Sequence, residues 1–296
     1  MKRLSSHTLR TLSMPLGMVV GALLCRQIVA LDSWSGGWIT PVLIFIMLFF
    51  TYCRVDISKM RVTMMHFWLF AAQVVGAMVL YTLCEPLGQT IAQGAMVCAL
   101  APIAMAAVVI GGMLGANVPS MVTYSLICNL VTALVAPTIL HTFGNGTCTF
   151  AEIIGRVAPT LIAPFVVAQL LRLVWRKAAD WFAAHGGISF YLWLISLVLV
   201  LGRTTCFILD TEANIWVEVA LAAVALLLCV GQYSLGRAIG RVVGDPVTVG
   251  QSLGQKNTIL VVWMSLNFLD PVASIAPTAY IIWQNLVNSW QIYKHK

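Results

Sequence analysis

Apolar runs of about twenty residues recur along the whole chain, and they constrain its fold more than any other feature. Each run is long enough to cross a bilayer as a helix. Only 9% of the 296 residues are charged, whereas soluble domains have about 25%. We therefore predict an all-α polytopic membrane protein, a single membrane domain over residues 1–296 with ten transmembrane helices: 8–30, 37–53, 62–84, 90–111, 117–143, 152–175, 188–208, 213–236, 246–268 and 271–292.

The placement of the basic residues orients these helices. Lys and Arg gather in loops that an even number of spans puts on one side, and cytoplasmic loops carry this excess. The residues are Lys2, Arg3, Arg10, Arg54, Lys59, Arg61, Arg172, Arg176, Lys177, Arg237, Arg241, Lys294 and Lys296. We therefore expect both termini in the cytoplasm. The net charge of +7 reflects membrane topology, and we expect no nucleic-acid partner.

Eight cysteines are scattered along the chain as single residues. They form no CxxC pair and have no His-rich partner segment, so neither a metal site nor a disulfide framework is indicated. We expect no cofactor.

Ten spans divide into two halves of five, and the halves then insert with opposite orientation because five is an odd number. This is the arrangement of an inverted repeat, which many secondary transporters share. The predicted repeats are 8–143 and 152–292.

The ninth predicted helix is interrupted by the stretch Gly250–Asn257. Gly250 and Gly254 weaken a helix, so we expect a backbone break there. Lys256 puts a charge at bilayer depth, which costs roughly 2.5–3.5 kcal/mol and usually marks a functional site. Binding candidates in this stretch are Ser252, Gln255, Lys256 and Asn257. A close-packed helix face is the alternative explanation for the glycines.

A weaker interruption in the first half has the same order of residues. Gly111, Gly112 and Gly115 are predicted to break the fourth helix, and Asn117 follows them. Paired interruptions of this kind indicate a transporter's binding site. The further polar candidates are Gln73, Asn117, Ser125 and Asn129. A hydrogen bond from Ser125 to its own helix is as good an explanation as ligand binding. Isolated polar groups in hydrocarbon are costly, so we expect one polar cluster around Lys256 near mid-membrane, made of Gln73, Asn117, Ser125, Ser252, Gln255 and Asn257.

The stretch Ser252–Asn257, with Ala279–Trp290 after it, resembles the bile acid:sodium symporter family, including its bacterial members. That family has the motif Glu-x-Gly-Met-Gln-Asn in a broken ninth helix, followed by the tenth. Gln73 resembles its third-helix glutamine, which contacts a sodium ion. Gly111–Asn117 resembles its broken fourth helix, although Asn117 matches either an asparagine of that helix or one that opens the fifth.

The segment Leu134–Ile139 resembles the end of the family's fifth helix, which puts Ser125 at the position of a sodium-binding hydroxyl. The resemblance implies a core and a panel, with the two broken helices crossing in the core. The core-like part would be 62–143 with 213–292, and the panel-like part 8–53 with 152–208.

Two departures from the family motif bear on coupling. The motif glutamate, shared by both sodium sites, is Ser252 here, and the motif glutamine is Lys256. The site has thus lost a carboxylate and gained an ammonium, which would repel a sodium ion beside it. Burial favours the neutral amine, so Lys256 could gain and lose a proton. We therefore expect transport coupled to protons or to no ion, with sodium coupling as the alternative.

Together these features favour a secondary active transporter over an enzyme. The substrate class would be a small organic anion that resembles a bile acid, pantoate or a keto acid, bound at the crossover. An intramembrane enzyme or a channel is the alternative from another class. Gly250–Gly254 spells a hydrolase GxSxG, but it lies in a membrane span, and the only later histidine is His295. We expect a bacterial inner-membrane protein in contact with lipid, either a monomer or a weak homo-oligomer.

Overall fold

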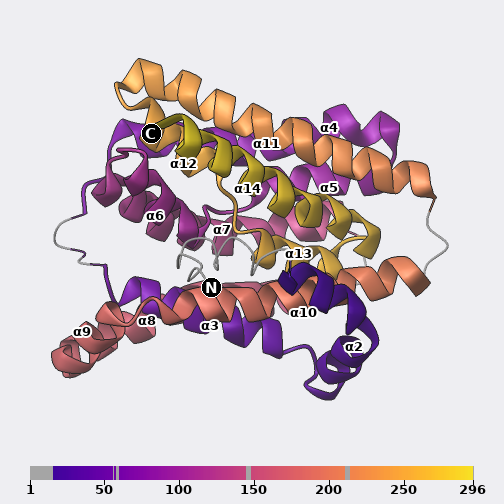
Figure 1. The fold of residues 1–296 in the computed structure, drawn as a ribbon, viewed down its shortest axis with the longest axis horizontal. Helices are drawn as coiled ribbons and strands as arrows, with labels where there is room; N and C mark the ends of the chain where they lie inside the picture. Colours follow the sequence, from indigo (N-terminus) through magenta and orange to yellow (C-terminus); the bar gives the residue numbers. More distant parts are fainter. Residues whose placement is uncertain (1–15, 56, 58–59, 145–147, 211–213, 296) are drawn as a thin grey trace, which may run out of the picture. The chain divides into compact units, whose positions relative to one another are not determined.

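The computed structural model describes residues 16–55, 57, 60–144, 148–210 and 214–295, and its elements are helices (Figure 1). Within these residues the only β-type pairing is one isolated bridge. The elements are Leu16–Leu23, α2 (Cys25–Trp34), α3 (Ile39–Tyr52), α4 (Met64–Cys84), η2 (Glu85–Leu87), α5 (Gln89–Leu100), α6 (Met105–Met113), α7 (Val118–Phe143), α8 (Phe150–Val174), α9 (Arg176–Ala184), α10 (Ile188–Asp210), α11 (Ile215–Val243), α12 (Pro246–Gly254), α13 (Thr258–Phe268), η3 (Pro271–Ser274) and α14 (Ile275–His295).

Five helices of the described chain are long and apolar enough to cross a membrane: Met64–Leu87, Val118–Phe143, Phe150–Val174, Ile188–Asp210 and Ile215–Val243. A sixth span results if Leu16–Leu23 and α2, which are bent by 74°, are counted as one. The chain is therefore an all-α integral membrane protein. The finer arrangement of ten spans in two repeats stays a prediction. Of the residues used to orient the chain, Lys2, Arg3, Arg10, Lys59 and Lys296 lie outside the described part.

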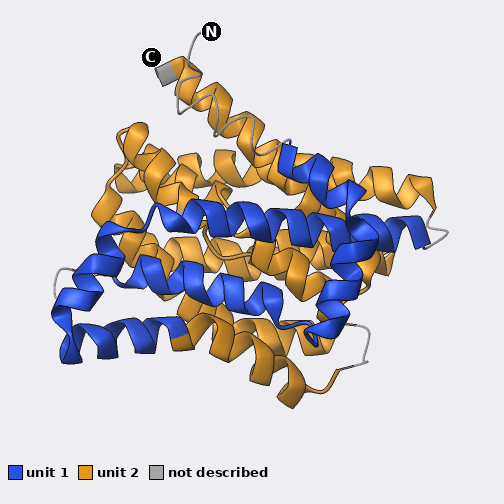
Figure 2. Cartoon of the chain, turned by 60° about the horizontal axis from the view of Figure 1, so that its bottom comes forward, with its two compact units in different colours: residues 1–54, 164–212 blue, residues 55–163, 213–296 orange. Residues whose placement is uncertain are grey.

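The chain divides into two compact units (Figure 2). Unit 1 comprises Met1–Arg54 and Pro164–Glu212, and unit 2 comprises Val55–Ala163 and Ala213–Lys296. In unit 1, α10 packs against α2 and α3, and α3 packs against α9. Two ion pairs tie its helices together, Arg26 with Asp210 at 2.6 Å and Arg203 with Asp32 at 3.2 Å.

Unit 2 contains the same order of elements twice. A long helix is followed by a half-helix, an extended segment, a second half-helix and another long helix. The first set is α4, α5, α6 and α7, and the second is α11, α12, α13 and α14. Two asparagines cap helix starts in this unit: Asn117 caps the long helix α7 by accepting from the Ser120 amide, and Asn257 caps the half-helix α13 by accepting from the Leu260 amide.

Helices α11 and α12 pack closely against each other in unit 2. A Cβ on Gly236 of α11 would lie 2.7 Å from the Val249 carbonyl oxygen and 2.9 Å from the Gly250 Cα. A Cβ on Gly254 would lie within 2.4 Å of the Tyr233 ring. Gly250 and Gly254 therefore allow close helix packing, which is the alternative weighed above. Helix α12 continues through Gly250 and ends at Gly254, so the break lies at 255–257, within the predicted stretch.

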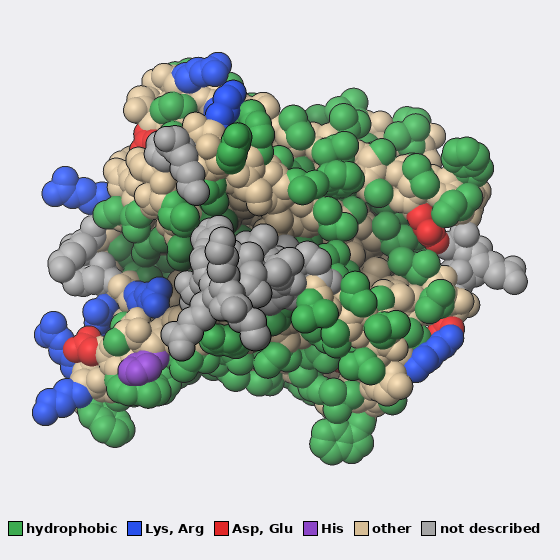
Figure 3. Space-filling view, viewed as in Figure 1, with side chains coloured by type: hydrophobic (Ala, Val, Ile, Leu, Met, Phe, Trp, Pro, Cys, Tyr) green, Lys and Arg blue, Asp and Glu red, His purple; other side chains and the backbone are tan. Residues whose placement is uncertain are grey.

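Large apolar side chains cover much of the surface of both units (Figure 3). In unit 2, Leu227 of α11 is 71% exposed and Phe67 of α4 is 61% exposed. In unit 1, Leu173 of α8 is 82% exposed. Soluble proteins rarely expose apolar area on this scale, so lipid is the surrounding medium that these faces fit.

Candidate functional site

The two half-helix pairs of unit 2 meet where their extended segments cross. Ile103 and Lys256 form an isolated antiparallel bridge. The Ala104 amide donates to the Gln255 carbonyl at 2.9 Å, and the Asn257 amide donates to the Pro102 carbonyl at 2.7 Å. Pro102 has no amide hydrogen, which helps to end α5 before the crossing. The two segments thus satisfy each other's backbone groups, which no helix satisfies.

This crossing corrects the expected position of the first break. Gly111, Gly112 and Gly115 were expected to interrupt the fourth helix. Instead the extended segment is 101–104, and Gly111 and Gly112 lie in the last turn of α6. Gly115, with φ +81°, belongs to the turn between α6 and α7. Glycine is common near a helix end, so these glycines do not by themselves mark a break within the membrane. The break at 101–104 occurs where the segment 255–257 can hydrogen-bond the exposed backbone.

Lys256 is only 2% exposed, and its ammonium lies at the C-terminus of α5. Nζ donates to the carbonyl oxygens of Ala99 at 3.1 Å and Ala101 at 3.0 Å. The backbone amide of Lys256 donates to Oε1 of Gln284 at 3.0 Å. A helix C-terminus carries partial negative charge, so it suits a cation. Lys256 therefore occupies a cradle of carbonyl oxygens rather than pointing toward lipid.

Gln73 of α4 binds the carbonyl between the two that Lys256 binds. Its Nε2 donates to the Leu100 oxygen at 2.6 Å and to the Thr132 hydroxyl at 3.3 Å. Its Oε1 accepts from the Tyr124 hydroxyl at 3.0 Å and from the Cys128 thiol at 3.0 Å. The side chains of Gln73 and Lys256 thus bind three successive carbonyls at the end of α5, those of Ala99, Leu100 and the C-cap residue Ala101.

A polar row on α14, absent from our sequence interpretation, begins at this region and continues along α11 and α12 away from it. Gln284, Asn288 and Gln291 recur at helical spacing, and all three are buried. Besides the Lys256 amide, they bind the Tyr233 hydroxyl and Nε2 of Gln251. The spacing i, i+4, i+7 in an apolar segment was the pattern that could have revealed them.

Several buried polar atoms near the crossing have no hydrogen-bond partner within the described residues. Two of them belong to α7: Ser125 Oγ and Asn129 Oδ1, while Nδ2 of Asn129 donates to the Ser125 carbonyl at 2.7 Å. The others follow α12 toward the crossing: Gln251 Oε1, Ser252 Oγ and Gln255 Nε2. Buried polar groups are nearly always bonded, so these five atoms are candidates to bind water or a ligand.

Asn117 lies at the other end of α12 from Lys256. Its backbone amide donates to the Thr248 hydroxyl at 2.7 Å, in the first turn of α12. Roughly 9 Å of helix axis separates Thr248 from Gly254. No hydrogen bond of the described chain joins Asn117 to Lys256, and the Asn117 and Asn257 side chains both accept from helix-start amides.

The side chains at the crossing contain no carboxylate, and no group of three or more His, Cys, Asp or Glu that could hold a metal occurs in the described residues. The charged side chain at the crossing is that of Lys256. The Lys256 nitrogen donates hydrogen bonds to two carbonyl oxygens at the end of α5, so its charge stabilises these oxygens as a bound cation would.

The sequence profile of the SBF-like CPA transporter family (DUF4137) matches residues 51–286. No curated protein matches the chain.

Proposed function

Because this chain belongs to the SBF-like CPA transporter family, we propose that it is a secondary active transporter of a small organic anion. The observation that carries the proposal is the crossing of 101–104 and 255–257, with Lys256 bound to the end of α5. Irregular backbone at membrane depth is tolerated only where protein covers it or where it lines a cavity. Discontinuous helices of this kind form the substrate sites of transporters.

The electrostatics of the four half-helix ends favour an anion. Lys256 and Gln73 bind carbonyls at the negative end of α5, and the Tyr280 hydroxyl binds the Gly254 carbonyl at the negative end of α12. Helix α6 begins at the crossing, and no side chain caps its N-terminus. A helix start with free amides attracts negative charge. The substrate class is therefore an organic acid.

We extend the proposal to the whole architecture. Ten spans would form two inverted repeats, 8–143 and 152–292, with both termini in the cytoplasm. The repeated order of elements in unit 2 and the charge bias of the loops support this arrangement. Unit 2 would be the core, unit 1 the panel, and the core would rock against the panel to expose the site alternately. The division of the chain into these units supports the assignment.

Coupling in this proposal does not involve sodium at the Lys256 site. The carbonyls of Ala99 and Ala101 are bound by an ammonium, and a sodium ion beside it would be repelled. Transport would then be coupled to a proton, with Lys256 as its carrier, or to no ion.

The test is substrate uptake into proteoliposomes, screened over small organic acids at fixed pH with and without a sodium gradient. We expect wild-type uptake to be independent of sodium and the Lys256→Gln variant to lose at least about tenfold in rate, since one lost charged hydrogen bond amounts to about 1.5–3 kcal/mol. Lys177→Gln, which removes the same charge from an exposed lysine of α9, is the control. Uptake that needs sodium equally in wild type and Lys256→Gln would refute the coupling proposal, and ionic current at channel rates would refute the transporter.

A further inference from the structure

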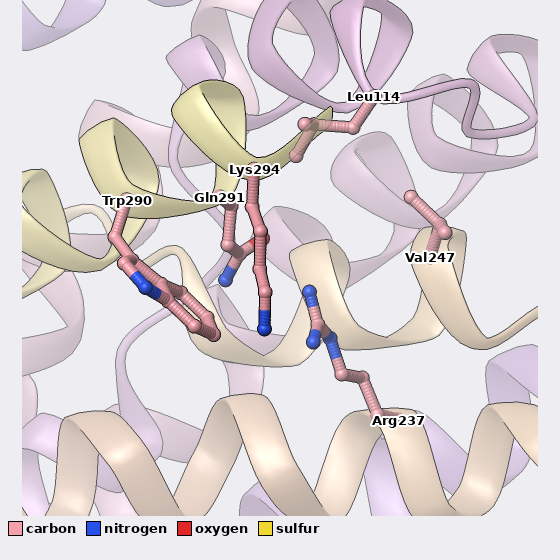
Figure 4. A pocket seen from close by; sticks show the side chains of 6 residues that line it. All are labelled: Leu114, Arg237, Val247, Trp290, Gln291 and Lys294. Carbon is pink, nitrogen blue, oxygen red and sulfur yellow. The ribbon is translucent and has the colours of Figure 1, made fainter. Parts of the chain in front are cut away.

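A second polar site lies in unit 2, away from the crossing. It is a pocket of about 200 Å³, larger than a phosphate group needs, between the end of α6, the last third of α11, the start of α12 and the end of α14 (Figure 4). Six residues line it: Leu114, Arg237, Val247, Trp290, Gln291 and Lys294. Val247 is at the start of α12, whereas Lys256 follows its end, so the two sites are distinct.

Two cations face each other across this pocket. Figure 4 shows the ends of the Arg237 and Lys294 side chains converging in its centre. No acidic residue lines the pocket, and no ion pair of either side chain is found in the described part of the chain. Asp245, which precedes α12, caps that helix by accepting from the Thr248 amide. Converging like charges repel, and a bound anion would remove the repulsion.

The remaining walls add one donor and an apolar surround. Oε1 of Gln291 accepts from Gln251 at 2.5 Å, which leaves the Nε2 group of Gln291 to donate, and Figure 4 shows it on the pocket side. The Lys294 ammonium lies 4.9 Å from the centroid of the Trp290 ring, which holds it beside the pocket. A guanidinium fork, an ammonium and an amide thus point at one small volume.

We propose that this pocket binds the phosphate group of an anion. A phosphate monoester carries a charge of about −1.5 to −2 at neutral pH, which matches the two cations better than a carboxylate does. Arginine recognises such a group with two parallel hydrogen bonds, and lysine adds a point charge. The phosphate could belong to a soluble compound or to a lipid headgroup. The proposal does not depend on what the crossing transports.

The test is a titration of the purified full-length protein with inorganic phosphate, with thermal unfolding as the readout and chloride at equal ionic strength as the reference. We expect phosphate to raise the unfolding temperature saturably in wild type. We expect Arg237→Gln and Lys294→Gln to weaken phosphate binding at least tenfold. Arg241→Gln is the matched control, because it removes the same charge one turn further along α11 and does not line the pocket. Lys294 is exposed, so its variant tests the site even if Arg237→Gln fails to fold.

Vesicles distinguish the two sources of phosphate. The protein is reconstituted in phosphatidylcholine with and without phosphatidic acid, and the bound lipid is counted by mass spectrometry. Phosphatidic acid retained by wild type and Arg241→Gln, lost in Lys294→Gln and displaced by free phosphate, supports a headgroup site. Phosphate binding that is unaffected by phosphatidic acid supports a soluble ligand. A phosphate effect no larger than that of chloride, or equal effects in all variants, would overturn the proposal.

Discussion

At the scale of single residues, the site depends on how the end of α5 is satisfied. Three successive carbonyls, from Ala99 to Ala101, lack helical partners in an apolar interior, and Lys256 and Gln73 supply the donors. Both residues were site candidates from the sequence alone. Their shared partner, the backbone at the end of α5, was not foreseeable because it belongs to a third segment of the chain.

A substitution of Gln73 tests this interpretation of the site. Gln73→Leu removes the donor to Leu100 and the acceptor for Tyr124, and both groups stay buried. We expect a loss of about 1–3 kcal/mol in stability, the cost of a buried unsatisfied group. Thermal unfolding in detergent would measure it. Gln27→Leu, an exposed glutamine of α2, should change the unfolding temperature little; equal effects of the two variants would contradict the assigned role.

At the scale of elements, backbone contacts position the half-helices in addition to the side-chain hydrogen bonds at their ends. The crossing is closed by amide–carbonyl bonds of Ala104 and Asn257, and α12 is placed by its close approach to α11 at Gly236. The ninth predicted helix is broken directly after Gly254, within the predicted stretch Gly250–Asn257. Gly250 and Gly254 also allow the close approach of α12 to α11.

Two glycines of α11 allow the effect of close helix packing to be measured separately from the effect of helix propensity. Gly236→Ala would put a Cβ 2.7 Å from the Val249 oxygen, and backbone cannot move aside cheaply. We expect it to destabilise the protein by about 1–3 kcal/mol, the usual range for overpacking. Gly231→Ala on the same α11 meets nothing within 4 Å, so it should stabilise the helix or leave it unchanged. The assay is the unfolding temperature of both variants. A Gly236→Ala protein as stable as Gly231→Ala would show that α11 and α12 are not closely packed there.

At the scale of the whole molecule, the apolar exposed faces and the family membership establish an integral membrane protein. The ten spans and their orientation stay predictions, which rest on apolar run length and on the charge of the loops. The described helices are compatible with that count because α5, α6, α12 and α13 are halves of longer apolar segments.

The orientation predicts which positions react with an impermeant thiol reagent outside intact cells. Single cysteines at Lys2 and Tyr293 should stay unlabelled until the membrane is permeabilised. A cysteine at Ser33, in the predicted connection between the first two spans on the opposite side, should react at once. The unsubstituted chain gives the background from its eight native cysteines. Labelling of either end from outside would show that the predicted orientation or the predicted number of spans is wrong.

The sequence by itself determined the properties that follow from local composition. The length of the apolar runs indicated membrane helices. A lysine inside one of them marked a site, because a charge in hydrocarbon is costly and is usually retained for function. The motif around Ser252–Asn257 identified the family, with the carboxylate replaced and an ammonium gained. None of these inferences needed to know which segments touch.

Only the tertiary structure decided which backbone groups lack partners and what satisfies them. The first break lies at 101–104 and not at Gly111–Asn117, because Gln255 and Asn257 bond that segment across the crossing. Asn117 and Lys256 are separated by the length of α12, whereas Gln291, Arg237 and Lys294 are brought to one pocket from two helices. Hydrogen bonds and charges that converge from distant parts of the chain leave no local pattern, so the fold alone reveals them.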